Sequence, residues 1–170
     1  MQTLAESIAH VSAWFEAIPA ERFFARGEGD WSPSDNVDHL IKSQRTLASA
    51  LGLPKEKLVE LFGLVVAPSR SYEHICEIYR QALADGGAAS GRYLPDQQSP
   101  SPDVAESVKS DLLASWSESG ERLLVGATAW GESDLDGYLL LHPLLGALTV
   151  REMLFFNIYH NRRHASSEGD

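Results

Sequence analysis

Apolar side chains recur every three or four positions through most of this sequence, the spacing that places them on one face of an α-helix. Leu4, Ile8 and Val11 begin the first such stretch. The pattern predicts helices near residues 3–18, 33–51, 71–85, 102–129 and 150–165, with a short extra helix over 55–62. No segment alternates with period two over a useful length, so we expect no sheet and predict an all-α fold.

Residues that begin helices lie where this pattern needs them. Ser32, Pro33 and Asp35 have the arrangement of an N-cap, a first-turn proline and an acidic third position. Thr149 and Glu152 have the T-x-x-E spacing of a capping box, so the last helix should begin there. Local chemistry therefore supports the beginnings of two of the predicted helices.

The longest irregular connection, residues 86–101, is rich in Gly, Ser, Gln and Pro. It could be a linker between two domains or a crossing loop over one bundle. Each side has too few apolar residues for a core of its own, which favours the crossing loop. We therefore expect residues 1–170 to form a single domain, a four-helix bundle with a long crossover connection and an extra short helix. Residues 131–148 are expected to be a loop.

Composition narrows the classes of partner. The chain has 170 residues, and its 14 Lys and Arg against 24 Asp and Glu give a net charge of −10. That charge argues against DNA, RNA or an anionic membrane as main partner. Because there is one cysteine and no stretch of eighteen apolar residues, we expect a cytoplasmic protein without disulfides or membrane spans. Cys76 lies in an apolar helical pattern, which favours a buried, inert thiol.

Three of the six histidines have positions suited to binding one metal ion. His160 and His164 are four residues apart, so both imidazoles leave one face of the last predicted helix. His39 lies about six residues inside its own helix, roughly 9 Å from the N-terminal end. Antiparallel packing of the two helices would bring all three imidazoles to one level and leave coordination positions open. The alternative is a solvated C-terminal turn, where cationic His and Arg suit the helix dipole.

The remaining candidate residues have simpler interpretations. His10 and His74 are expected to be solvated or core histidines, and His142, which precedes a proline, is expected to brace a loop. Asp35 lies one turn before His39 on the same helix face. It either orients that imidazole or only caps the helix.

Two blocks of the sequence carry longer motifs. Residues 31–40 read Trp-Ser-Pro-Ser-Asp-Asn-Val-Asp-His-Leu. Residues 142–164 contain H-P-x-L-G-x-L-T-x-x-E, then apolar residues and the H-x-x-x-H pair. The first block resembles the start of the second helix in the DinB-like superfamily, and the second resembles that family's ending. The resemblance spans nearly the whole chain and is specific at these two blocks.

This resemblance implies a four-helix bundle with a long crossover and, very often, a homodimer. It also implies one divalent metal ion held by three histidines, which map onto His39, His160 and His164. Three neutral imidazoles with open positions suit zinc or nickel, and also iron or manganese. The implied partner is a small-molecule substrate, and relatives of this kind include enzymes that use low-molecular-weight thiols.

Three hypotheses about function follow. In the first, the metal lowers the pKa of a bound thiol, which is then transferred to a small electrophile. In the second, metal-dependent hydrolysis, a general base is needed near the metal, and Asp35 is the candidate in the sequence. In the third, the protein binds a metal or a stress ligand without catalysis. Fold resemblance alone does not choose among them.

Overall fold

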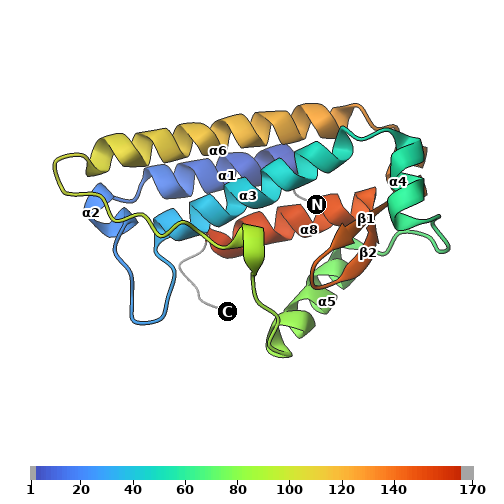
Figure 1. Ribbon diagram of the computed structural model, residues 1–170, viewed down its shortest axis with the longest axis horizontal. Helices are drawn as coiled ribbons and strands as arrows, with labels where there is room; N and C mark the ends of the chain where they lie inside the picture. Colours follow the sequence, from blue (N-terminus) through green and yellow to red (C-terminus); the bar gives the residue numbers. More distant parts are fainter. Residues whose placement is uncertain (1–2, 166–170) are drawn as a thin grey trace.

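The computed structural model describes residues 3–165 of the chain, and its framework is four long helices lying side by side (Figure 1). They are α1 (Leu4–Glu16), α3 (Pro33–Leu51), α6 (Ala105–Thr128) and α8 (Val150–His164). The ribbon shows α1 and α8 running in one direction and α3 and α6 in the other. This arrangement confirms the all-α four-helix bundle with a long crossover that the sequence predicted, and it sets α3 antiparallel to α8.

Shorter helices connect and flank the bundle. The chain leaves the end of α3 and returns to the start of α6 through a long crossover that contains two helices and one 3-10 turn. These elements are α4 (Lys55–Phe62), α5 (Tyr72–Ala84) and η1 (Gly91–Tyr93); α2 (Ala20–Phe23) and α7 (Glu132–Gly137) lie outside the crossover. Helices α4 and α5 were predicted. The other three were not, because they are too short to show a helical period.

Residues 131–148 differ from the loop that the sequence predicted. They hold α7 and an antiparallel hairpin of β1 (Leu139–His142) and β2 (Gly146–Thr149). The expectation of no sheet was therefore wrong at this hairpin, because four-residue strands are too short to establish a period of two. Gly146 has a φ of 73°, the left-handed conformation that closes such three-residue hairpin loops.

Capping explains where the bundle helices begin. Ser32 and Asp35 form a reciprocal capping box on α3, and Thr149 and Glu152 form one on α8. Helix α6 begins at Ala105, three residues later than predicted, and its N-cap makes no side-chain hydrogen bond. A turn over residues 102–104 precedes the helix, which is why it begins later than the apolar spacing predicted.

The core consists of two apolar clusters along the bundle. One joins α1, α2 and α6 to the first half of α3, around Phe15, Phe23 and Trp116. The other joins the second half of α3 to α4, α5, the hairpin and α8. Cys76 is buried on α5, as predicted, and burial raises the pKa of its thiol. No helix within residues 3–165 combines the length and the apolar character needed to cross a membrane.

Candidate metal centre

Three histidines from two helices meet at one end of the bundle. His39 comes from the second turn of α3, and His160 and His164 come from the last turns of α8. Their nearest ring nitrogens all lie within 4.8 Å of one another. The Nε2 atoms of His39 and His160 are 2.9 Å apart. The antiparallel packing of α3 and α8 therefore gathers the three imidazoles that the sequence singled out.

Hydrogen bonds orient two of these rings. His39 Nδ1 lies 2.7 Å from the carbonyl oxygen of Tyr93, in η1. His164 Nδ1 lies 2.6 Å from Oδ1 of Asn36, which is on α3. Oxygens of this kind only accept, so each Nδ1 donates its hydrogen and each Nε2 keeps a lone pair. Such outer contacts fix the tautomer of a metal-binding histidine.

The third ring is held differently. His160 is buried, and its ring stacks on Phe156 with centroids 4.9 Å apart and an interplanar angle of 25°. Among residues 3–165, nothing forms a hydrogen bond with its Nδ1 atom, although that atom is buried. Stacking on Phe156 and the 2.9 Å contact between its Nε2 and that of His39 therefore position this imidazole. A buried polar atom without a partner is uncommon and occurs most often where function requires it.

Burial keeps the cluster neutral. It lowers the pKa of all three imidazoles, and for His160 and His164 neighbouring imidazoles lower it further. Neutral imidazole is the form that binds a metal ion. Two nitrogens bound at ~2.1 Å to one ion lie roughly 3 to 3.5 Å apart, close to the His39–His160 separation. The donor set and its spacing fit a divalent ion, so these three histidines could hold one.

Trp31 and Asp35 have separate roles near this cluster. The Trp31 ring lies 5.0 Å from the His39 ring and stacks on the His164 ring at 6.0 Å, so it forms a wall of the site. Asp35 binds Arg26 through both carboxylate oxygens, at 2.7 and 2.8 Å, and accepts the Ser32 amide hydrogen. Of the two roles considered for Asp35, capping is the one that its contacts support.

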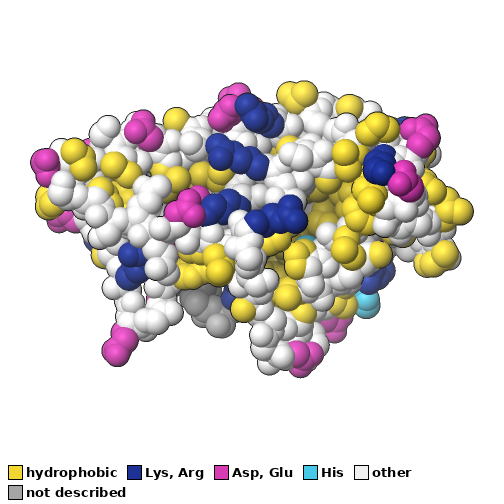
Figure 2. All heavy atoms as spheres, in the orientation of Figure 1, with side chains coloured by type: hydrophobic (Ala, Val, Ile, Leu, Met, Phe, Trp, Pro, Cys, Tyr) yellow, Lys and Arg dark blue, Asp and Glu magenta, His cyan; other side chains and the backbone are white. Residues whose placement is uncertain are grey.

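Two cavities reach the histidines. The first, of about 320 Å³, is lined by His39 and His160 and by apolar residues of the hairpin, α4 and α8. The second, of about 970 Å³, is lined by His39, His164 and Trp31. Figure 2 shows a hollow with hydrophobic walls below α3, with Lys and Arg side chains gathered beside it. The cluster is therefore accessible to small molecules.

The remaining histidines lie apart from the cluster or serve another purpose. His10 and His74 are exposed, in line with the solvated alternative. His142 accepts hydrogen bonds from two backbone N–H groups of its own loop, so it braces that loop as predicted. Sequence reasoning missed Asn36, although its position three residues before His39 places it on the same face of α3. It could not have found the Tyr93 contact, because the acceptor there is a backbone carbonyl.

Fold and site together define a class: a four-helix bundle in which two antiparallel helices bring three imidazoles to one point. The chain belongs to the DinB superfamily, whose family model matches residues 3–167. No curated protein and no solved structure matches the chain.

Proposed function

We propose that His39, His160 and His164 hold one divalent ion, zinc or nickel, and that the protein uses it to transfer a low-molecular-weight thiol to a small electrophile. The observation that carries the metal assignment is the convergence of three neutral imidazoles whose nitrogens lie within 4.8 Å. Hydrogen bonds to Tyr93 and Asn36 place the ring hydrogens of His39 and His164 on Nδ1, so the Nε2 atom of each ring keeps a lone pair that can bind an ion. The site therefore requires little rearrangement to accept an ion.

The transfer reaction draws support from the two cavities and from the family. His39, His160 and His164 would hold the ion, and a divalent ion bound there would lower the pKa of a coordinated thiol and favour its thiolate form. Arg22 and Arg163 line the second cavity, where guanidinium groups suit the carboxylates that many small thiols carry. The first cavity has mainly apolar walls, which suit an electrophile of low polarity. Both cavities include His39, so two reactants can approach the same centre.

Metal-dependent hydrolysis has weaker support. It needs a general base near the metal, and both oxygens of Asp35 are committed to Arg26. That ion pair lowers the pKa of Asp35 despite the opposing effect of burial, which makes the carboxylate a poorer base. Of the described residues that line the cavities, only Asp30 has a carboxylate, and it is exposed. A purely storage or structural role would favour a closed site with a fourth protein ligand.

Metal analysis tests the assignment directly. Protein purified without a metal-affinity tag should carry close to one equivalent of zinc or nickel by elemental analysis, or take it up in titration. His39→Ala and His160→Ala should each weaken binding by at least about a hundredfold, since each removes a ligand. His74→Ala, which removes an exposed histidine on α5, is the matched control and should bind normally. Equal binding by all variants would reject the site.

Turnover tests the second half of the proposal. The zinc- or nickel-loaded protein is incubated with cysteine or a cysteine-containing tripeptide and with 1-chloro-2,4-dinitrobenzene, and thioether formation is followed by absorbance. The native protein and His74→Ala should accelerate the reaction, whereas His160→Ala should not. Stoichiometric metal without acceleration across a panel of thiols and electrophiles would reject the transferase and leave the metal site intact.

The homodimer predicted from the sequence stays a prediction. The apolar residues Leu61, Leu64 and Val66, in and after α4, are 51%, 68% and 95% exposed, which supports contact with another chain at that end of the bundle. Light scattering at micromolar concentration should give twice the chain mass. A monomer mass would reject the dimer.

A further inference from the structure

His142 is held in a single tautomer by its own loop. It is the last residue of β1, and its Nδ1 atom accepts hydrogen bonds from the backbone N–H groups of Leu144, at 3.2 Å, and Leu145, at 3.1 Å. Two donors pointing at one nitrogen require a lone pair there, so the ring hydrogen must be on Nε2. The hairpin therefore fixes which nitrogen of His142 can donate.

The ring that carries this donor lines the first cavity. His142 is 8% exposed and lines the cavity of about 320 Å³ that also contains His39 and His160. The two hydrogen bonds described for the His142 side chain both end at Nδ1. The Phe156 ring packs against both histidines, with its centroid 4.2 Å from that of His142 and 4.9 Å from that of His160. Because His142 and His160 line the same cavity, one small molecule bound there can contact both rings.

We infer that the first cavity binds an uncharged substrate with an apolar body, and that His142 donates a hydrogen bond from Nε2 to a carbonyl or similar acceptor oxygen of that substrate. This inference deepens the proposed function, because it names the class of electrophile that would meet the thiol. A hydrogen bond to a carbonyl oxygen both orients the molecule and withdraws electron density from the group under attack.

The chemistry of the cavity favours a neutral ligand. Burial lowers the pKa of His142 to about 4, so the ring is uncharged near neutral pH and cannot compensate a buried anion. Most of the cavity wall is apolar, including Leu47, Phe62 and Met153. A carboxylate would lose its hydration there without an ion pair at His142, whereas a ketone or ester loses much less.

In the alternative, His142 only braces its loop and binds no ligand. The variant His142→Asn separates these two roles. In His142→Asn the side-chain Oδ1 takes the place of Nδ1 and can still accept the Leu144 and Leu145 N–H groups. The shorter side chain has nothing at the position of Nε2. This variant keeps the contact that holds the loop and leaves no donor at the position of Nε2, and unchanged thermal stability shows that the loop is intact.

Acetophenone and ethylbenzene are suitable probes, since they differ mainly by a carbonyl group in place of a methylene. Their affinities for the full chain are measured by ligand-observed NMR, for the metal-free and the zinc-loaded protein. We expect the affinity ratio of acetophenone to ethylbenzene to fall roughly three- to tenfold in His142→Asn, the effect of losing one neutral hydrogen bond. Ethylbenzene should bind the variant and the native protein equally well.

An unchanged ratio in a folded variant, or failure of both probes to bind the native protein, would overturn the inference. If His142→Asn does not fold, side-chain ¹⁵N spectra of the native protein decide instead: acetophenone, but not ethylbenzene, should shift the Nε2 resonance of His142, and equal shifts count against the donor. The affinity ratio of acetophenone to ethylbenzene can be measured without metal or thiol. The expected fall in this ratio can therefore be observed even if the protein transfers no thiol. Thiol transfer can likewise be observed even if the ratio is unchanged.

Discussion

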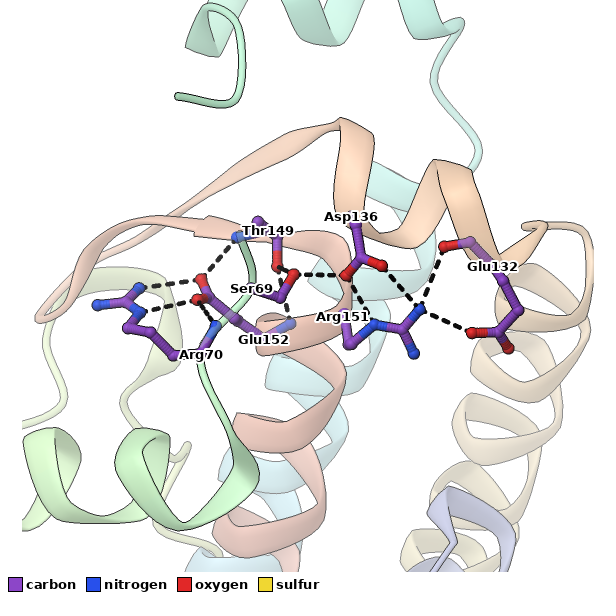
Figure 3. A network of polar contacts seen from close by, with 7 residues as sticks. All are labelled: Ser69, Arg70, Glu132, Asp136, Thr149, Arg151 and Glu152. Carbon is purple, nitrogen blue, oxygen red and sulfur yellow. Dashed lines mark hydrogen bonds and ion pairs between the residues drawn. The ribbon is translucent and has the colours of Figure 1, made fainter. Parts of the chain in front are cut away.

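The two ends of α8 handle buried polar groups in opposite ways. At the N-terminal end, the Glu152 carboxylate accepts hydrogen bonds from the backbone and guanidinium of Arg70 and from the Thr149 amide, at 2.7 to 2.9 Å. Ser69, Asp136 and Arg151 continue the network (Figure 3). At the C-terminal end, three imidazoles face one another, and one buried nitrogen of His160 has no partner within residues 3–165.

This contrast separates a structural site from a binding site. Among residues 3–165, no buried side-chain N or O atom around Glu152 lacks a hydrogen-bond partner, so this site has no unmatched group for a ligand to satisfy. Around His160, three imidazole nitrogens lie within 4.8 Å of one another, and the buried Nδ1 of His160 has no hydrogen-bond partner among residues 3–165. Both regions contain buried polar groups, and of the two only the region around His160 contains a buried nitrogen without a hydrogen-bond partner among residues 3–165. The predictions below test that difference.

The largest expected effect on stability is at Glu152, at the N-terminal end of α8. Glu152→Ala removes the acceptor of four hydrogen bonds and half of a capping box, so the free energy of unfolding should fall by about 3 to 4 kcal/mol. The metal affinity of the folded variant should stay within about threefold of native, because Glu152 is roughly 12 Å along α8 from His160. Urea denaturation and zinc titration measure the two quantities. A large loss of metal affinity would mean that the two ends are coupled.

Acid should affect the two kinds of buried group in different pH windows. Burial lowers the pKa of His142 to about 4 in the folded protein, whereas the pKa in the unfolded chain is ~6.5. Between pH 6.5 and about 4, His142 is therefore protonated in the unfolded chain and neutral in the folded protein. The metal-free protein should therefore lose up to about 3 kcal/mol from this group as the pH falls through that window. Burial raises the pKa of Glu152, but hydrogen bonds from Arg70 outweigh this effect, so the pKa lies below its usual value. Glu152 therefore stabilises the fold above its unfolded pKa, and this stabilisation is lost as the pH falls through its folded pKa.

Denaturation of His142→Asn between pH 7 and 4 checks this sign. Asn does not titrate, so the variant's stability should depend less on pH across that range than that of the native protein. Parallel profiles for the two proteins would show that His142 binds its proton equally in the folded and unfolded states.

A substitution at Asn36 should have a smaller effect, confined to the histidine cluster at the C-terminal end of α8. Asn36→Ala removes the acceptor that holds His164 Nδ1, and contacts of this kind are worth about tenfold or more in metal affinity. We expect zinc to bind about tenfold more weakly, with a change in stability below about 1 kcal/mol. Asn36→Asp keeps an acceptor oxygen and should retain the affinity. Equal affinity in the alanine variant would show that His164 needs no partner.

A substitution at Glu132, at the exposed edge of the network around Glu152, should have almost no effect on stability. Glu132 pairs with Arg151 at 2.7 Å, but its side chain is 85% exposed, and Asp136 holds the same guanidinium at 2.7 and 3.0 Å. Glu132→Gln should therefore change the free energy of unfolding by less than about 0.5 kcal/mol. Thermal denaturation at low and high salt measures it. A loss comparable to that of Glu152→Ala would contradict the view that burial sets the importance of these ion pairs.

Sequence reasoning reached the bundle and the histidine cluster because both depend on local spacing. The i, i+4 pair His160 and His164 and the two capping boxes are short-range patterns, and antiparallel packing then places His39. The hairpin was missed because its strands are too short to show a period. The Glu152–Arg70 contact joins residues 82 positions apart, and no local pattern indicates such a pairing.

The contacts around His39 have a consequence for when the site comes into existence. Its Nδ1 partner lies 54 residues further along the chain and its Nε2 neighbour 121 residues further. During synthesis, which proceeds from the N-terminus, His39 therefore emerges long before either contact can form, and a nascent chain presents it as a lone imidazole with negligible hold on a metal ion. Metal capture becomes possible only after α8 has docked, so a bound ion would report that the last helix is in place.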